Sequence, residues 1–213
     1  MESTITAIRQ QKRNPQRVNI YLDGVFAFPV AKIVAAWLKV GQRLSPEKIQ
    51  ELKGLDDIEK AFQRALNFLS FRPRSQAEVE RNLRKHEVAE DLIPEIIARL
   101  KRGNLLNDVD FANKWVEDRT VFRPRGAYAL RAELRLKGAA DTAIDKALAN
   151  IDEPHLARQA AKKKVRQLSQ LEWQEFRNKL SSYLSRRGFG YEVVAEICKE
   201  VWQDLKEESR QYE

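Results

Sequence analysis

Apolar residues recur at the spacing of an α-helix through most of the chain beyond residue 54. In one stretch they stand at i, i+3, i+4, i+7, i+8 and i+11, which places them in a continuous stripe on one helix face. The members of this stripe are Ile58, Ala61, Phe62, Ala65, Leu66 and Leu69. The pattern predicts a helix whose apolar face packs against other elements.

A four-residue motif follows this helix and returns later in the chain. Phe71-Arg72-Pro73-Arg74 recurs as Phe122-Arg123-Pro124-Arg125, 51 residues further on, and the apolar and basic positions behind each copy keep the same spacing. Self-similarity at a fixed period of this size is typical of repeat proteins, in which one unit cannot bury its apolar face alone. The motif therefore predicts a unit made of a helix, an Arg-rich connector, a helix, a short turn and a helix.

Three such units are predicted, at residues 55–106, 107–152 and 153–213. The third lacks the connector motif, as is common for a terminal repeat. Capping signals agree with the division: Ser75 and Glu78 have the spacing of a capping box at a helix start. The fold predicted for these residues is mainly α-helical, with nine helices in an elongated, curved array of three-helix repeats.

Residues 1–54 follow a different pattern and are predicted to form a small α/β region. Apolar and polar residues alternate in three short runs, which is the period of a half-buried strand. Asp23-Gly24 lies between the last two runs and predicts a hairpin with a type I′ turn, because both central residues of that turn need positive φ. The three predicted strands form a meander.

The rest of this region is predicted to consist of two short helices. We expect Pro29 to end the last strand and residues 30–39 to form an apolar helix that closes at Gly41. Ser45 has the character of an N-cap before a second helix, which we expect to end at Gly54. These helices would cover the apolar face of a sheet that is marginal by itself.

Residues that carry catalytic or metal-binding chemistry are sparse. Neither His86 nor His155 has a second histidine or a cysteine at ligand spacing, and Cys198 falls on an apolar helix stripe. No phosphate-binding glycine loop or hydrolase motif is present. We therefore predict no catalytic residue, no metal and no cofactor, and a Mg²⁺-dependent nuclease is the weaker alternative. The four tryptophans are predicted to pack in cores.

Charge and hydropathy add a hint of the partner and of the location. The net charge is +8 with a pI near 9.6, and residues 1–50 hold eight Lys and Arg against three Asp and Glu. Such a balance favours a polyanionic partner. No apolar run approaches the roughly 20 residues of a membrane span. With one cysteine and no visible secretory signal, we expect a cytoplasmic monomer.

Basic residues recur once per predicted repeat, which makes them the candidate contacts. A connector at the same place in each repeat would present its arginines on one side of the array, where they could bind carboxylate or phosphate groups. The alternative is that Arg72 and Arg123 pair with acids of their own repeat, such as Glu78 or Glu117. The repeat candidates are Arg72, Arg74, Arg123, Arg125, Lys162, Lys163, Lys164, Arg166, Arg186 and Arg187.

A basic loop in the N-terminal region supplies further candidates. The loop joins the first two predicted strands, and it could either contact a partner or protect edge strands from pairing with other chains. Its candidate residues are Arg9, Lys12, Arg13 and Arg17.

Several motifs, in the same order along nearly the whole chain, resemble the bacterial RecX family. The family's pattern has a glycine after the second helix of a repeat where this chain has His86-Glu87, which makes the local turn there different. The matching motifs are Ile5-Thr6-Ala7-Ile8, the hairpin from Arg17 to Gly24, Gly41-x-x-Leu44-Ser45, Ala65-Leu66-x-x-Leu69-x-x-Arg72-x-x-Ser75, Leu106-Asn107-Asp108-x-x-Phe111-Ala112-x-x-Trp115, Leu134-x-x-Lys137-Gly138 and Arg187-Gly188-Phe189.

The resemblance implies a non-catalytic regulator of the RecA recombinase. Family members are built of tandem three-helix units, bind in the groove of the RecA–DNA filament and usually inhibit its ATPase, its strand exchange and its growth. A role in homologous recombination, DNA repair and the SOS response would follow, with single- or double-stranded DNA as a further partner. A sequence-nonspecific DNA-binding protein that acts without RecA is the alternative.

Overall fold

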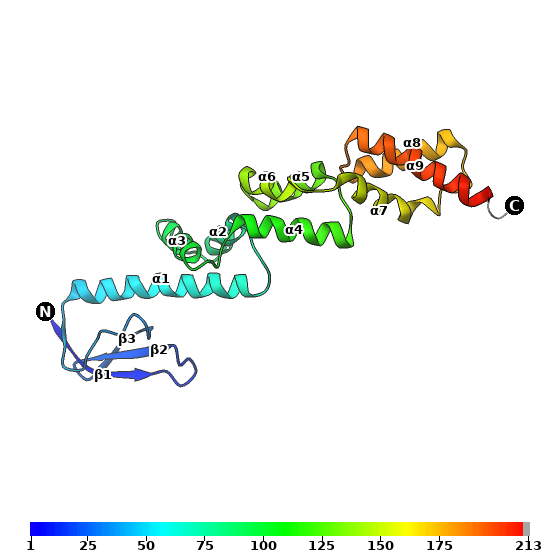
Figure 1. Ribbon diagram of the computed structural model, residues 1–213. Helices are drawn as coiled ribbons and strands as arrows, with labels where there is room; N and C mark the ends of the chain where they lie inside the picture. The colour runs from blue at the N-terminus through cyan, green and yellow to red at the C-terminus, as the bar shows by residue number, and fades with distance from the viewer. Residues whose placement is uncertain (211–213) are drawn as a thin grey trace. The chain divides into compact units, whose positions relative to one another are not determined.

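The computed structural model describes residues 1–210, except for the side chains of Lys163 and of residues 208–210. It divides into a first unit, residues 1–72 with 79–105, and a second unit, residues 73–78 with the described residues from 106 onward. Within residues 1–210 it holds four strands and nine helices (Figure 1): β1 Ser3–Gln10, β2 Arg17–Leu22, β3 Val25–Ala31, β4 Arg43–Leu44, α1 Pro46–Ser70, α2 Gln76–Lys85, α3 Ile93–Arg102, α4 Asp108–Phe122, α5 Ala127–Lys137, α6 Asp141–Leu148, α7 Glu153–Val165, α8 Trp173–Arg186 and α9 Tyr191–Arg210. The predicted mainly helical fold with an N-terminal meander is confirmed.

The meander forms an antiparallel sheet with the strand order β3-β2-β1-β4. The predicted type I′ turn is confirmed, since Asp23 has φ 50° and Gly24 has φ 88°. The sheet has four strands where three were predicted, because β4 pairs with the start of β1 through Ser3 and Leu44. Strand residues such as Ile5 and Ile20 are fully buried in the core of this region.

The prediction that Pro29 ends the last strand is wrong, because β3 continues through it to Ala31. β3 is an edge strand, and proline is tolerated there when its nitrogen lies on the unpaired side. Ala31 lies two residues after Pro29, so its N–H points to the same unpaired side of the strand. This N–H donates to Oδ1 of Asp56 in α1 at 2.7 Å and not to another strand. Position 29 therefore needs no ladder hydrogen bond.

The apolar helix predicted at residues 30–39 is also absent. Residues 32–37 form successive turns instead, closed by hydrogen bonds such as those from Val34 and Ala35 to the carbonyl of Ala31. Without a helix there is no stripe to carry Trp37 into the core, and its side chain is 88% exposed. The core placement predicted for tryptophan is therefore wrong at this position.

One long helix, α1, replaces the two helices predicted on either side of Gly54. Glycine inside a helix costs only about 1 kcal/mol relative to alanine, and α1 buries residues on both sides of that position, Leu52 before it and Ala61 after it. α1 runs along the sheet in Figure 1. It also packs against α3 within the first unit, where Arg99 of α3 pairs with Glu59 at 2.6 Å.

Three-helix cores recur along the chain. In the first unit α3 starts at Ile93, with Pro94 in its first turn. In the second unit α4, α5 and α6 enclose a core that includes Phe111, Leu130 and Ile144. The last three helices enclose the core residues Leu156, Ala157, Ala160, Ala161, Val165, Leu168, Phe176, Leu180, Leu184, Phe189, Val194, Ile197, Cys198 and Val201.

The middle helix of every repeat ends in the same way. One or two residues past the end of α2, α5 or α8, a residue adopts positive φ. The N–H that follows it donates back to a buried leucine carbonyl, as from Ala139 to Leu134 at 3.1 Å. In α5 and α8 this residue is glycine, Gly138 and Gly188, with φ 78° and 83°. In α2 it is Glu87 with φ 58°, so the turn that the sequence marked as different keeps the repeat's geometry without glycine.

Candidate interaction surface

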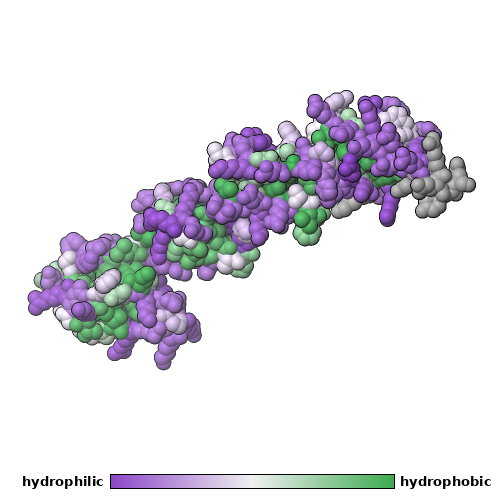
Figure 2. Space-filling view, in the orientation of Figure 1, coloured by the Kyte–Doolittle hydropathy of each residue, from purple (hydrophilic) through white to green (hydrophobic). Residues whose placement is uncertain are grey.

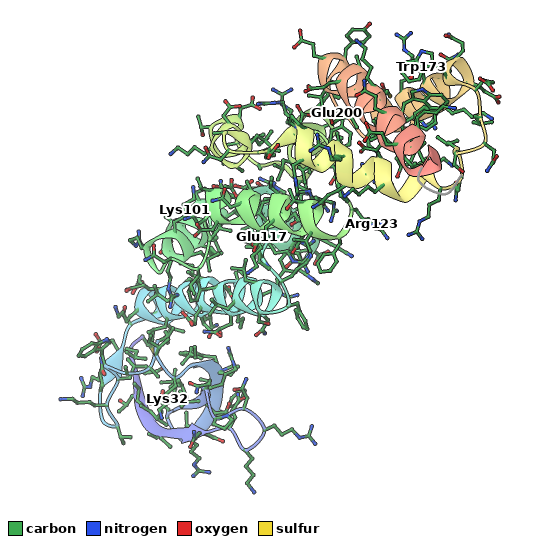
Figure 3. The ribbon with its side chains drawn as sticks, turned by 45° about the vertical axis from the view of Figure 1, so that its right-hand side comes forward. Lys32, Lys101, Glu117, Arg123, Trp173 and Glu200 are labelled. Carbon is green, nitrogen blue, oxygen red and sulfur yellow. The ribbon has the colours of Figure 1, made fainter. Side chains whose placement is uncertain are left out.

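The second connector, residues 122–125, presents an aromatic and a cationic side chain to solvent at the end of α4. Phe122 is 72% exposed and Arg123 is exposed, and Figure 3 labels Arg123 at this end of the helix. Pro124 is buried between them and the start of α5. Tyr128, in the first turn of α5, is 80% exposed. The turn therefore displays an exposed set of Phe122, Arg123 and Tyr128.

The other arginine of this connector is held by internal contacts. Nη1 of Arg125 lies 2.9 Å from Oε1 of Glu133, and Oε2 of the same carboxylate accepts bonds from Trp115 Nε1 and Arg119 Nε at 2.9 and 3.0 Å. Glu133 therefore ties the connector to α4 and α5. The alternative from sequence named internal pairs for Arg72 and Arg123, whereas the pair seen in this connector is that of Arg125 with Glu133.

The first connector repeats part of this arrangement. Phe71 is 82% exposed, while Arg72 and Arg74 are half-buried. Ser75 then caps α2 as predicted, because its Oγ accepts a bond of 3.2 Å from the N–H of Glu78. An exposed phenylalanine at the end of the preceding helix is common to both connectors: Phe71 directly follows α1, and Phe122 is the last residue of α4. The expectation from sequence overlooked it. Its recurrence in the repeated motif was the available signal.

Within the second unit, the start of one middle helix meets the end of the next. Ser75 Oγ donates to the carbonyl of Lys137 at 2.5 Å, before α2 and at the end of α5. The N–H of Gly126, before α5, donates to the carbonyl of Arg187 after α8 at 3.0 Å. A side chain at position 126 has no room, since a Cβ would lie 2.2 Å from the carbonyl oxygen of Gly188. We call these two contacts the junctions.

Carboxylates complete both junctions in the same way. The N–H of Gln76, which opens α2, donates to Asp108 Oδ1 at 2.8 Å. The N–H of Ala127, which opens α5, donates to Glu153 Oε1 at 2.8 Å. In each case the acid is the first residue of the following repeat's first helix, and it satisfies an N–H that the helix leaves unpaired. Within the second unit, hydrogen bonds thus hold residues 75 and 76 to the second repeat and the start of α5 to the third.

The basic residues of the third repeat are divided between exposed and internal positions. Lys162, Arg166 and Arg186 are exposed. Lys164 is half-buried and donates to Gln167 Oε1 at 2.6 Å. Arg187 donates from Nη1 to the carbonyl of Pro124 at 3.1 Å and lies over the ring of Tyr183, so it supports a junction. Lys163 is also a predicted contact, but its side chain lies outside the described part of the structure.

The N-terminal loop candidates divide in a similar way. Lys12 and Arg13 are exposed at the loop tip. Arg9 lies over the ring of Tyr21, with 4.9 Å from its Cζ to the ring centroid. Arg17 is withdrawn into an ion pair with the buried carboxylate of Asp56. Burial acts to raise the pKa of Asp56, but the hydrogen bonds from Arg17, Lys60 and Ala31 hold it below its ordinary value.

Two features of the described residues bear on metal binding and on cysteine reactivity. No cluster of three His, Cys, Asp or Glu side chains able to hold a metal ion occurs among the described residues. Burial raises the pKa of the Cys198 thiol to about 11, which makes its thiolate scarce at neutral pH. In the described part of the chain, no helix is long and apolar enough to cross a membrane.

Comparisons with protein-family models match four successive parts of the chain. The Regulatory protein RecX N-terminal domain matches residues 3–45. The first, second and third three-helix domains of RecX match residues 61–100, 107–148 and 152–198. Each helical match falls within one of the three-helix groups seen in the structure.

Similar proteins and structures carry the same description. A regulatory protein RecX of Bacillus subtilis is 36% identical over 202 residues, 92% of this chain and 76% of that protein. One of Bacillus pumilus is 34% identical over 97% of this chain and 81% of its own length. A crystal structure of regulatory protein RecX superimposes with a TM-score of 0.81 at 29% identity, covering 92% of this chain and 98% of that one. The RecX of Lactobacillus salivarius gives 0.65 over 69% of this chain and 97% of that chain, at 30% identity.

Proposed function

This chain belongs to the RecX family of regulatory proteins, and from that premise we propose that it is a non-catalytic regulator of the RecA recombinase. In this proposal it binds the RecA filament on single-stranded DNA and inhibits the ATPase, strand exchange and filament growth. Its setting is recombination and repair in the cytoplasm, and it acts as a monomer. We keep the division into residues 1–54, 55–106, 107–152 and 153–213 as part of this proposal, although α1 spans the first boundary.

The repeated connector is the observation that carries the proposal. Phe71 and Phe122 stand at equivalent positions and are both largely exposed, and Arg123 is exposed beside the second. Aromatic and arginine side chains contribute most of the binding energy in many protein interfaces. A partner that is itself a regular polymer offers the same groove at fixed intervals, which suits a chain that repeats its contact residues.

Repetition also makes weak contacts sufficient. Once one connector has bound, the next binds at a high effective concentration, so the avidity of the chain exceeds the affinity of either site. Within the second unit, the hydrogen bonds of the junctions hold the start of α5 to the third repeat.

The alternative function, sequence-nonspecific DNA binding without RecA, rests on the exposed lysines and arginines. Lys12, Arg13, Lys162 and Arg166 would serve as phosphate contacts in either function. They carry no aromatic or shape-specific element of their own. We therefore place DNA contact second to protein contact.

A pull-down with RecA tests the proposal and separates it from the alternative. We expect the chain to bind RecA filaments and to lower their DNA-dependent ATPase at 200 mM salt. Pure phosphate binding loses most of its affinity between about 50 and 200 mM salt. Binding to bare single-stranded DNA with no effect on RecA would contradict the proposal, and a cleavage product with Mg²⁺ would indicate a nuclease.

A further inference from the structure

A groove of about 1040 Å³ lies within the first unit, between the sheet and α1. One wall consists of the loop before β2 and the residues after β3, and the other consists of α1 with one residue of α3. Four cationic side chains line it, Arg17, Lys60, Arg64 and Arg99, against one carboxylate, Glu59. Four amide side chains complete its polar lining.

The contacts of these side chains leave the groove positive. The single lining carboxylate, Glu59, is buried and already paired with Arg99 at 2.6 Å. Arg99 is further held over the ring of Phe62, with its Cζ 3.6 Å from the centroid. Arg64 is exposed on α1, and Lys60 keeps 53% of its side chain exposed beside Asp56 and Asp57. On the other wall Arg17 is paired with Asp56, so the cations open to an anionic ligand, Lys60, Arg64 and Arg99, lie on the helical wall. Amide side chains lie on both walls.

A largely exposed indole lies a short way along the chain from this groove. Ile33 lines the groove, and Trp37 follows it by four residues, which bounds their Cα separation at about 14 Å. The segment between β3 and β4 carries Lys32 and Lys39 and no acidic residue. The N–H of Lys32 donates to the carbonyl of Gln16 at 2.7 Å, which places Lys32 at the groove's rim. Figure 3 labels Lys32 beside the sheet.

We propose that this groove and Trp37 together form a binding site for single-stranded nucleic acid, in which Lys60, Arg64 and Arg99 contact phosphates and the indole of Trp37 stacks on a base. A positive groove that follows the backbone beside an aromatic platform is the usual arrangement of such sites. This site is distinct from the connectors. It rests on the proposed function in one respect, that a filament regulator meets single-stranded DNA within its partner.

The form of the surface favours nucleic acid over an acidic protein segment. A protein partner anchors apolar side chains in packed pockets, and the apolar lining of the groove consists of only Ala31 and Ile33. A nucleobase needs no pocket, since it stacks on an open aromatic face, and Trp37 offers one. Figure 2 shows hydrophobic side chains gathered on the surface of the first unit, with hydrophilic side chains around them.

The test measures binding of a fluorescein-labelled oligo(dT) to the full chain by anisotropy, without recombinase. We expect Trp37→Ala to weaken binding roughly 5- to 100-fold, the loss of one stacked base. We expect Arg64→Ala to reduce the slope of log K against log salt by about 0.7, the loss of one phosphate contact. Tyr191→Ala and Lys101→Ala are the matched controls, since both side chains are exposed outside the groove, and neither should have these effects.

Three outcomes would overturn the proposal. Wild-type affinity and salt slope in both Trp37→Ala and Arg64→Ala would show that the nucleic acid binds elsewhere. Absence of measurable binding of oligo(dT) to the wild-type chain at 50 mM salt would show that the chain has no such binding site. Loss of RecA binding in Trp37→Ala with unchanged oligonucleotide binding would make the surface a protein-docking site. A wild-type chain that binds oligo(dT) through Trp37 but leaves the RecA ATPase unaffected would instead contradict the proposed function alone.

Discussion

The Arg17 guanidinium donates a hydrogen bond to each oxygen of the Asp56 carboxylate, from Nη1 to Oδ1 at 3.1 Å and from Nη2 to Oδ2 at 2.8 Å. The pair joins the start of β2 to the middle of α1, and the Asp56 side chain is 2% exposed. Asp56 also accepts the edge-strand N–H of Ala31, so one carboxylate fastens two strands to the helix. A buried, bidentate pair of this kind fixes geometry more than it adds net stability.

We expect Asp56→Ala to lower the free energy of unfolding by about 3–5 kcal/mol, because it leaves the Arg17 guanidinium and the Ala31 N–H without their acceptor. The measurement is urea denaturation of the full chain followed by circular dichroism. Asp57→Ala is the matched control, since Asp57 is exposed and pairs with the exposed Lys60. An exposed pair is worth about 0–1 kcal/mol. Equal effects of the two substitutions would contradict this account.

The same carboxylate makes the stability of the first unit depend on pH. Its pKa is lower in the folded than in the unfolded chain, so its contribution is present above the unfolded value of about 3.9 and is lost as the pH falls through the folded pKa. We expect the difference in unfolding free energy between the wild type and Asp56→Asn to shrink below about pH 4. Denaturation curves at a series of pH values measure it. A difference that stays constant down to pH 2 would show that Asp56 is not the group responsible.

Gly126→Ala should destabilise the second unit by about 1–3 kcal/mol, because the new Cβ would meet the Gly188 carbonyl oxygen at 2.2 Å and force the junction apart. Gly54→Ala is the contrasting control. It lies inside α1 with no atom within 4 Å of an added Cβ, so the better helix propensity of alanine should raise stability by about 1 kcal/mol. Thermal and urea denaturation of both variants check the pair. An unchanged free energy of unfolding in Gly126→Ala would contradict this, because it would show that the junction can move to make room for the new Cβ without loss of stability.

Glu87→Gly should stabilise the first unit. Positive φ costs a residue with a Cβ about 1–2 kcal/mol, and the greater freedom of glycine in the unfolded chain offsets about 0.5–1 kcal/mol of that. A net gain of about 0.5–1 kcal/mol remains. His86→Gly, at the preceding position, has no positive φ to relieve and should be neutral or destabilising. Urea denaturation of the two variants compares them, and a gain in both would point to a cause other than the backbone conformation.

The double substitution Phe122→Ala with Arg123→Ala should raise roughly 30-fold the concentration of this protein that half-inhibits the RecA ATPase. This is the change expected for the loss of about 2 kcal/mol at an interface centre. The fold should be unchanged, because both side chains are exposed. Circular dichroism checks the fold and a coupled ATPase assay the inhibition. Tyr191→Ala, a similarly exposed aromatic residue, should inhibit like the wild type. Full inhibition by the double variant would exclude this connector from the contact.

The pattern of the chain determined the helical repeats, the type I′ hairpin and the caps, because these depend on local spacing and on single residues such as Ser75 and Gly138. The tertiary structure decided which polar groups are available to a partner. Arg17 and Arg125 look like surface arginines in the sequence, yet Asp56 and Glu133, 39 and 8 residues away, hold them internally. Trp37 fits a helical stripe but lies exposed in turns. Burial and ion pairing depend on contacts between residues that are distant in the sequence, and the periodic spacing of apolar residues does not predict those contacts.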